Sequence, residues 1–157
     1  MKNLFKNKSI IILGGTGSFG KNFVHSCLKK NSFRRIIIFS RDEYKQYEMK
    51  KKFSHKSLRY FLGDIRDQER LNFAFKNVDF VVNAAALKQV PAAEYNPIEF
   101  VKTNIIGSQN IINAALSNNV KKVISLSTDK AAAPVNLYGA TKLCSEKLFV
   151  SANNISG

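Results

Sequence analysis

The chain has 157 residues, enough for one domain with a hydrophobic core and too few for two large domains. Its formal net charge of +14 would suit a polyanion, but the lysines are scattered without the interleaved aromatic residues of a nucleic-acid groove. The sequence has no apolar run long enough to span a membrane and no signal-peptide hydrophobic region, so we expect a cytoplasmic protein.

Short apolar, β-branched runs alternate with longer amphipathic segments along the chain. Strands are expected at 9–13, 35–39, 58–62, 79–83 and 120–127, with helices directly after the first strand and at 42–53, 66–76, 96–117 and 138–151. Apolar strands that alternate with helices indicate an α/β fold with a parallel sheet covered on both faces. Right-handed crossovers favour a doubly wound Rossmann sheet of strand order 3-2-1-4-5, so we expect 1–157 to be one NAD(P)-binding domain.

Apolar residues at helical spacing predict the buried helix faces. The expected sets are Phe19, Phe23, Val24 and Cys27 in the first helix and Val101, Ile105, Ile112 and Leu116 in the long helix. The third helix has Leu71, Phe73 and Phe75 as its apolar residues. Cys27 and Cys144 have no CxxC or histidine spacing around them, so we expect buried, reduced thiols and no metal site. His25 and His55 are isolated and are expected at the surface.

A glycine-rich loop, GGTGSFG at 14–20, follows the first expected strand and opens into a helix. Gly14 would permit the tight turn, Gly17 would let the backbone approach a pyrophosphate, and Gly20 would let helix and strand pack closely. The helix N-terminus adds free N–H groups and the positive end of its dipole. The loop therefore predicts a mononucleotide or dinucleotide site that includes Thr16, Ser18 and Phe19.

The end of the second expected strand bears on which nicotinamide cofactor is bound. NAD sites place an acid there for the ribose hydroxyl, whereas NADP sites offer positive charge to the 2′-phosphate. This chain has Ser40-Arg41-Asp42, with Lys45 one turn on. Arg41 can grip a phosphate bidentately and Ser40 can donate a hydrogen bond. Asp42 favours NAD instead, unless its role is to cap the following helix. The charge pattern favours NADP over NAD.

Two further loops follow expected strands, at the edge where such sheets bind ligands. Asp64 of Gly63-Asp64-Ile65 could accept a hydrogen bond from the adenine amine. In the segment 83–88, which ends at Lys88, the small side chains of Ala84, Ala85 and Ala86 would let a cofactor pass close to the backbone. Ordinary tight packing would also explain these alanines.

A tyrosine and a lysine four residues apart, Tyr138 and Lys142, begin the last expected helix and share one face. A tyrosine has an ordinary pKa near 10, and a neighbouring ammonium and a positive nicotinamide would favour its phenolate. Such a phenolate can take a hydroxyl proton while hydride leaves the same carbon. An exposed helix start could carry this pair by chance, but Ser127 and Thr128 end the strand just before it. Cofactor contacts are also expected from Leu126, Ser127, Tyr138 and Lys142.

Five segments carry a more specific resemblance: GGTGSFG (14–20), SRDEYK (40–45), AAALKQVP (84–91), EYNP (94–97) and STDKAAAPVNLYGATK (127–142). With them the chain resembles the extended short-chain dehydrogenase/reductases. More closely, it is similar to the inverting UDP-N-acetylglucosamine 4,6-dehydratases and their relatives in capsule, O-antigen and flagellin-sugar synthesis. The resemblance covers essentially the whole chain.

The resemblance implies a mechanism. Tyr138, assisted by Lys142 and Thr128, would remove the 4-hydroxyl proton as hydride passes from C4 to NADP⁺. Lys130, which stands where retaining dehydratases carry glutamate, would remove the C5 proton. Asp129 would protonate the departing C6 hydroxyl before hydride returns to C6. Contacts with the UDP-sugar substrate are expected from Lys88, Ser127, Thr128 and Tyr138.

The sequence also departs from this family. Gln89 stands where histidine is usual and Ala133 where asparagine is common. The family runs to about twice this length, so we expect the substrate-binding region to be missing. The resemblance further implies a homo-oligomer formed through the helices from Asn96 and Tyr138. Other interpretations stay open: a related UDP-hexosamine dehydratase or epimerase, the soluble domain of a membrane-anchored relative, or a non-catalytic nucleotide-binding module.

Overall fold

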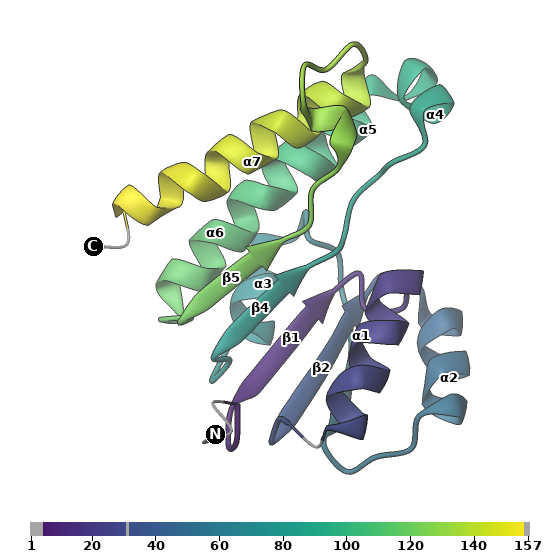
Figure 1. Cartoon of the computed structure of the whole chain (residues 1–157), viewed down its shortest axis with the longest axis vertical. Coiled ribbons are helices and arrows are strands. Elements are labelled where there is room, and N and C mark those ends of the chain that lie inside the picture. The colour runs from purple at the N-terminus through teal and green to yellow at the C-terminus, as the bar shows by residue number, and fades with distance from the viewer. Residues whose placement is uncertain (1–4, 31, 156–157) are drawn as a thin grey trace.

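The computed structural model describes residues 5–30 and 32–155, and over these residues five strands form one parallel sheet (Figure 1). The strands are β1 (Ser9–Leu13), β2 (Arg35–Ser40), β3 (Leu58–Leu62), β4 (Phe80–Asn83) and β5 (Lys122–Ser125). Their order is β3-β2-β1-β4-β5, which confirms the predicted order. The fifth strand is shorter than the predicted span 120–127.

Helices cover both faces of this sheet, α1 and α2 on one and α3, α6 and α7 on the other (Figure 1). The helical segments are α1 (Ser18–Lys29), α2 (Glu43–Lys52), α3 (Gln68–Ala74), α4 (Val90–Tyr95), α5 (Pro97–Phe100), the π-helical turn η1 (Val101–Ile106), α6 (Gly107–Ser117), the 3-10 turn η2 (Asp129–Ala131) and α7 (Leu137–Ile155). None of the helices in the described ranges is long and apolar enough to cross a bilayer.

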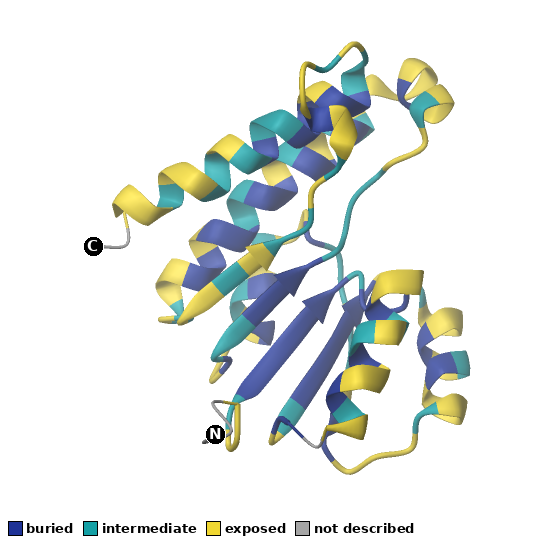
Figure 2. Cartoon of the chain, viewed as in Figure 1, coloured by how far each residue is buried: buried dark blue, intermediate teal, exposed yellow. Residues whose placement is uncertain are grey.

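The side chains on the two faces of β1 pack in two separate hydrophobic clusters. Ile10 and Ile12 pack in the cluster under α1 and α2, whereas Ile11 and Leu13 pack in the cluster under α3 and α6. Successive side chains of a strand point to opposite faces, so a strand covered on both sides must be apolar throughout. Figure 2 shows this as continuous burial along the central strands. Each such side chain contributes about 1.5–3 kcal/mol relative to an exposed one.

The chain between β4 and α6 differs from the prediction. The segment Val90–Tyr95 is a helix that we did not predict, and the expected helix 96–117 is divided into α5, η1 and α6. Pro91 and Pro97 each stand in the first turn of a helix, where the missing N–H costs little. Asn96 between them has φ −132° and ψ 51°, which breaks the helix. The two prolines therefore start two short helices.

The predicted buried stripe of the long helix is wrong for three of its four members. Ile112 is buried, but Leu116 is 37% exposed, and Val101 and Ile105 are only half-buried. The π-helical turn η1 is wider than an α-helical turn, so it shifts which residues face inward. Phe19, on the expected apolar face of the first helix, is 41% exposed, and Phe73 of the third helix is 54% exposed.

Polar side chains occupy part of the buried face in place of that stripe. Asn104 is 3% exposed; its Oδ1 accepts from Leu87 N at 2.9 Å, and its Nδ2 donates to Leu87 O at 2.9 Å and Thr141 Oγ1 at 3.0 Å. One turn on, the hydroxyls of Ser108 and Ser145 lie 2.7 Å apart. These contacts tie the loop after β4 and helix α7 to the same helix. Buried polar groups are tolerated because they are hydrogen-bonded.

The cysteines and histidines lie largely as expected. Both cysteines are free, Cys27 buried and Cys144 partly buried. Burial raises the pKa of the Cys27 thiol to about 11, so it stays a neutral thiol. His25 and His55 are exposed.

One acid joins the amino-terminal ends of three strands. Asp79 precedes β4, and its Oδ2 accepts from Ser9 N at 2.9 Å. Its Oδ1 lies 3.0 Å from Lys121 Nζ and 3.6 Å from Lys8 Nζ. Burial would raise the pKa of this carboxyl, but the hydrogen bond from Ser9 and the Lys121 and Lys8 ammonium groups outweigh it, and the pKa lies below its usual value.

We expect Asp79→Asn to lower the free energy of unfolding at pH 7 by about 1–2 kcal/mol, since the side chain is partly exposed. Because the folded-state pKa is depressed, the stabilisation is complete above the unfolded pKa of about 3.9 and is lost as the pH falls through the folded value. Urea unfolding of wild type and variant should therefore converge below about pH 4. Glu94→Gln on exposed α4 is the control. A difference that persists unchanged in acid would contradict this role.

Asn104→Ala should lower the free energy of unfolding by about 2–3 kcal/mol, because it leaves the Leu87 backbone groups without their partner. Hydrogen exchange of the Leu87 amide should accelerate together with the loss of stability. Asn113→Ala on α6, where the side chain makes only exposed hydrogen bonds, is the matched control and should cost about 0.5 kcal/mol or less. Equal losses of unfolding free energy from the two substitutions would contradict the role of Asn104 in holding the Leu87 backbone.

Candidate functional site

A cleft of about 520 Å³ lies at the carboxyl edge of the sheet, above the ends of β1 to β4. Many residues predicted to hold a cofactor line it: Gly14, Thr16, Gly17, Ser18, Ser40, Arg41, Asp42, Lys45, Asp64, Ile65, Ala84, Ala85 and Lys88. Gly63 and Ala86, from the two loops expected beside the cofactor, also line it, and three lining residues were not predicted: Lys21, Phe39 and Thr103. Six predicted residues are not in the lining: Phe19, Gly20, Leu126, Ser127, Tyr138 and Lys142.

The glycine loop brings two strand ends into backbone contact. Gly14 has φ +72°, and a Cβ there would stand 2.9 Å from the backbone of Ala84 and Ala85. Only a glycine therefore lets the loop after β1 lie against the loop after β4. Gly17 is the N-cap of α1 and offers no side-chain cap, so the first-turn N–H groups are left for a ligand. Such a helix start favours an anion.

The end of β2 is held in place by a buried glutamine. Gln46 Nε2 donates to Ser40 Oγ at 3.0 Å and to Phe61 O at 2.9 Å, which joins β2 to β3. Asp42 accepts a hydrogen bond from Lys45 N at 2.9 Å and therefore caps α2. The helix cap is one of the two roles expected for this acid. Its carboxylate also lies 3.0 Å from Lys45 Nζ. Hydrogen bonding by Lys45 lowers the pKa of Asp42.

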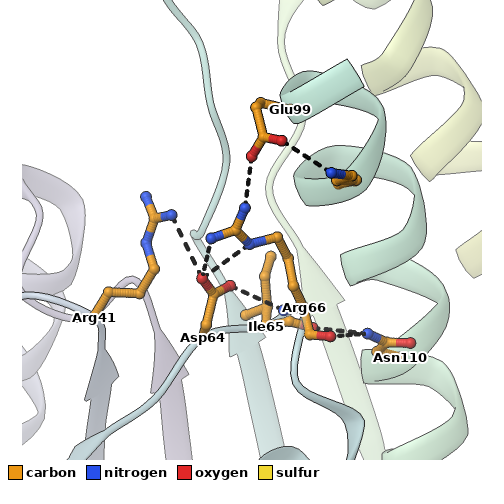
Figure 3. Close-up of polar contacts among 7 residues, drawn as sticks. Arg41, Asp64, Ile65, Arg66, Glu99 and Asn110 are labelled. Carbon is orange, nitrogen blue, oxygen red and sulfur yellow. Dashed lines mark hydrogen bonds and ion pairs between the residues drawn. The ribbon is translucent and has the colours of Figure 1, made fainter. Parts of the chain in front are cut away.

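A row of charged side chains starts at Arg41 and Asp64 in the cleft lining and continues through Arg66 to Glu99 (Figure 3). Arg66 donates to Asp64 Oδ2 from Nε at 2.9 Å and from Nη2 at 2.7 Å, and to Glu99 Oε2 from Nη1 at 2.7 Å. Arg41 Nη1 approaches the same Asp64 oxygen at 3.5 Å. Burial would raise the pKa of Asp64, but hydrogen bonds from Arg66 and the charges of both arginines hold it below its usual value. Asp64 is thus an anionic acceptor at neutral pH.

Thr103 is a lining residue that the sequence analysis missed. It belongs to η1, is 4% exposed, and its hydroxyl has no hydrogen-bond partner among the described residues. A buried hydroxyl without a partner is costly unless a ligand or water completes it. The sequence signal was available, since the polar pair Thr103 and Asn104 interrupts an apolar helix face. A regular α-helical period does not account for the π-helical turn, so it does not place Thr103 at the cleft.

The tyrosine and lysine predicted to be catalytic are buried side chains of α7. Tyr138 is 7% exposed and packs with Ala93 and Phe100. Lys142 is 6% exposed, and its Nζ donates to Leu126 O at 2.8 Å. Burial lowers the pKa of the Lys142 ammonium, against the opposing charge of Glu146. The two side chains therefore do not lie at an exposed helix start, which is the arrangement expected if the pair occurred by chance.

The segment Thr128–Lys130 forms a small exposed polar group before α7. Thr128 Oγ1 donates to Asp129 Oδ1 at 2.9 Å, and Lys130 Nζ lies 3.6 Å from the same oxygen. The Thr128 hydrogen bond and the Lys130 charge lower the pKa of Asp129. A Cβ on Gly139 would meet the Lys130 carbonyl, so this glycine lets α7 lie against the segment.

Ala133 follows this segment with φ +47°. Asparagine adopts this left-handed region more readily than alanine does. The position at which the chain departs from the family it resembles is therefore one where the backbone itself favours asparagine.

Comparison with known proteins shows to which family and to which individual proteins the chain is similar. The family described as "Polysaccharide biosynthesis protein" matches residues 10–157. The "UDP-N-acetylglucosamine 4,6-dehydratase (inverting)" of Campylobacter jejuni strain 81-176 is 60% identical over 154 residues, which is 98% of this chain and 46% of that protein. The "UDP-glucose 4-epimerase" of Rickettsia typhi is 44% identical over 94% of this chain and 44% of its own.

A solved structure agrees with these relatives. The X-ray structure of Pen from Bacillus thuringiensis superposes with a TM-score of 0.93 at 44% identity, over 96% of this chain and 46% of that one. The chain thus spans about half the length of the proteins that it matches. With the family match extending over nearly every residue, the chain belongs to the polysaccharide biosynthesis protein family.

Proposed function

We propose that this chain is the cofactor-binding and catalytic region of a UDP-N-acetylglucosamine 4,6-dehydratase that inverts C5, acting in the synthesis of surface polysaccharide or flagellin sugars. The observation that carries the proposal is the 60% identity to an inverting dehydratase over 98% of the chain. The cleft, the buried Tyr138 and Lys142, and the Thr128–Lys130 group supply side chains suited to that reaction.

A nicotinamide dinucleotide fits the cleft on three observations. The uncapped start of α1 offers N–H groups to a pyrophosphate. Gly14 keeps the loops after β1 and β4 in backbone contact with no side chain between them, and the buried hydroxyl of Thr103 has no hydrogen-bond partner among the described residues. Asp64 would accept from the adenine amine. Arg41, half-exposed at the end of β2, would bind a 2′-phosphate, while Asp42 is occupied as a helix cap. NADP is therefore favoured over NAD.

The first half-reaction falls to the residues of α7. When bound, the nicotinamide supplies the acceptor, and later the donor, of the transferred hydride. Tyr138 would accept the proton of the 4-hydroxyl group. Lys142, with its ammonium held by the Leu126 carbonyl, would favour the tyrosine phenolate by its charge. Thr128, just before η2, would orient the hydroxyl group by hydrogen bonding.

Elimination of water needs a base at C5 and an acid at the C6 hydroxyl. Asp129 and Lys130 start as an ion pair, 3.6 Å apart, in which the carboxylate holds no proton to donate. A substrate that covers them removes solvent and favours the neutral forms. Transfer of one proton from Lys130 to Asp129 then creates both the amine base and the carboxylic acid. The pair therefore suits the two roles without a net change of charge.

A 4-epimerase is the second candidate, because the Rickettsia typhi relative carries that name at 44% identity. An epimerase would share oxidation at C4 but would have no use for a base at C5. The role of Lys130 therefore separates the two candidates.

We also propose self-association through the helices of this domain. Apolar side chains are exposed on α7 and η1, including Val150 at 64%, Ile155 at 70% and Ile106 at 49%. These exposed apolar side chains are the observation that supports an interface on α7 and η1.

Arg41→Ala should weaken NADP binding by about 1.5–3 kcal/mol, the range for a lost charge-assisted hydrogen bond, and leave NAD binding nearly unchanged. Calorimetric titration of the chain with each cofactor measures both. Arg59→Ala, which removes an arginine of β3 outside the cleft lining, is the matched control. Equal affinity of the unmutated chain for NADP and NAD would overturn the assignment of Arg41.

Lys130→Ala should block removal of the C5 proton while oxidation at C4 continues. The test uses this chain joined to the C-terminal part of the Campylobacter jejuni dehydratase. Incorporation of solvent deuterium at C5 should fall by about 100-fold or more, the usual contribution of a general base. Absorbance of the reduced cofactor should still appear.

Tyr138→Phe is the companion variant and should stop the reaction before the reduced cofactor forms. Lys122→Ala, on the exposed edge of β5, is the control. Normal deuterium exchange by the Lys130→Ala protein would assign the C5 base to another residue.

A further inference from the structure

Asp64 is shared unequally between two arginines at the rim of the cleft (Figure 3). Arg66 binds its Oδ2 through two nitrogens, at 2.9 and 2.7 Å, and the Arg66 backbone N–H donates to its Oδ1 at 2.9 Å. Arg41 reaches the carboxylate through one nitrogen at 3.5 Å. Paired, short hydrogen bonds are the strong form of this contact. Asp64 is thus satisfied mainly by Arg66.

Arg66 is fixed from the opposite side as well. Glu99 of α5 accepts from its Nη1 at 2.7 Å, and Lys102 in turn pairs with Glu99 at 3.1 Å. Asn110 of α6 donates to the backbone carbonyls of Ile65 and Arg66 at 3.1 and 3.0 Å. Figure 3 shows Arg66 spanning the space between Asp64 and Glu99. Its side chain is therefore held against the carboxylate although it does not line the cleft.

Arg41 is left weakly engaged as a result. Its side chain is 53% exposed, it lines the cleft, and its contact with Asp64 is a single long ion pair. Such a partly exposed pair is easily exchanged for a better anion. Without Arg66, the Asp64 charge would be unneutralised, so it would hold Arg41 more tightly and repel any anion arriving beside it.

We propose that Arg66 is a positioning residue for cofactor selection, which occupies Asp64 so that Arg41 is available to a 2′-phosphate. The inference rests on the proposed function of the cleft as an NADP site. It adds that selectivity for the 2′-phosphate depends on a side chain that does not touch the cofactor. Arg66 acts through Asp64, so its effect must vanish when Asp64 carries no charge.

The experiment compares two probes that differ only in the phosphate at issue, adenosine 2′,5′-bisphosphate and adenosine 5′-monophosphate. Their affinities for the whole chain are measured by calorimetry, and the ratio between them removes any change in adenine binding. Arg66→Gln should lower the preference for the bisphosphate by roughly threefold to fivefold, the scale of one partly exposed ion pair. Asp64→Asn should raise that preference, because it releases Arg41 and removes the repelling charge.

The double variant Asp64→Asn with Arg66→Gln decides between an indirect role and a plain loss of charge. In the Asp64→Asn background, Arg66→Gln should leave the preference unchanged. Lys102→Gln, which removes the same charge at the far end of the row, should also leave it unchanged. An equal loss from Lys102→Gln, or an undiminished effect of Arg66→Gln in the double variant, would overturn the proposal.

The outcomes also separate this inference from the function on which it rests. If the unmutated chain binds the two probes equally, the proposed NADP preference fails. If it prefers the bisphosphate and Arg66→Gln keeps that preference, the preference stands and the role of Arg66 fails. Asp64→Asn addresses the same contact from the other partner, so the test survives poor folding of either single variant.

Discussion

The backbone contact between the loop after β1 and the loop after β4 sets the form of the cleft. The sheet order reverses at this point, since β2 and β3 lie on one side of β1 while β4 and β5 lie on the other. The following helices therefore leave in opposite directions, and a crevice opens between them at the carboxyl edge. Gly14, with φ +72° and no Cβ, lets the two loops touch at its floor. The loops, the start of α1 and the end of β2 then surround one space.

Buried polar contacts connect this space to the helix that carries Tyr138 and Lys142. Asn104 binds the Leu87 backbone, beyond the end of β4, and Thr141 on α7. A displacement of the loop after β4 would therefore disturb α7 as well. The π-helical turn makes this possible, because it turns Asn104 inward while Thr103 lines the cleft. A wider turn of this kind is often found at functional sites.

Although the chain carries a high net charge, particular acidic and basic side chains pair with one another at defined places. The formal charge of +14 supplies a general attraction for anions, which cannot by itself distinguish one phosphate from another. From the rim of the cleft outward, acids alternate with bases along Arg41, Asp64, Arg66, Glu99 and Lys102, so the positive charges are held at particular places. The exposed pair of Asp129 and Lys130 follows the same principle beside α7.

The five strands, their order and the glycine loop at the floor of the cleft were all predictable from the sequence. Apolar runs are local signals, the handedness of the crossovers limits the order, and a glycine loop between strand and helix is specific. The sequence also pointed to Arg41 and Asp64, which follow strand ends and line the cleft. By contrast, the short helix α4, the π-helical turn and the burial of Thr103 depend on tertiary packing, and the sequence did not predict them. Periodicity assumes regular turns, so it misplaced the buried stripe that η1 shifts. Likewise, Arg66 and Glu99 are 33 positions apart in sequence, and nothing local to either residue signals their contact. It exists because the fold brings α5 near the loop that follows β3.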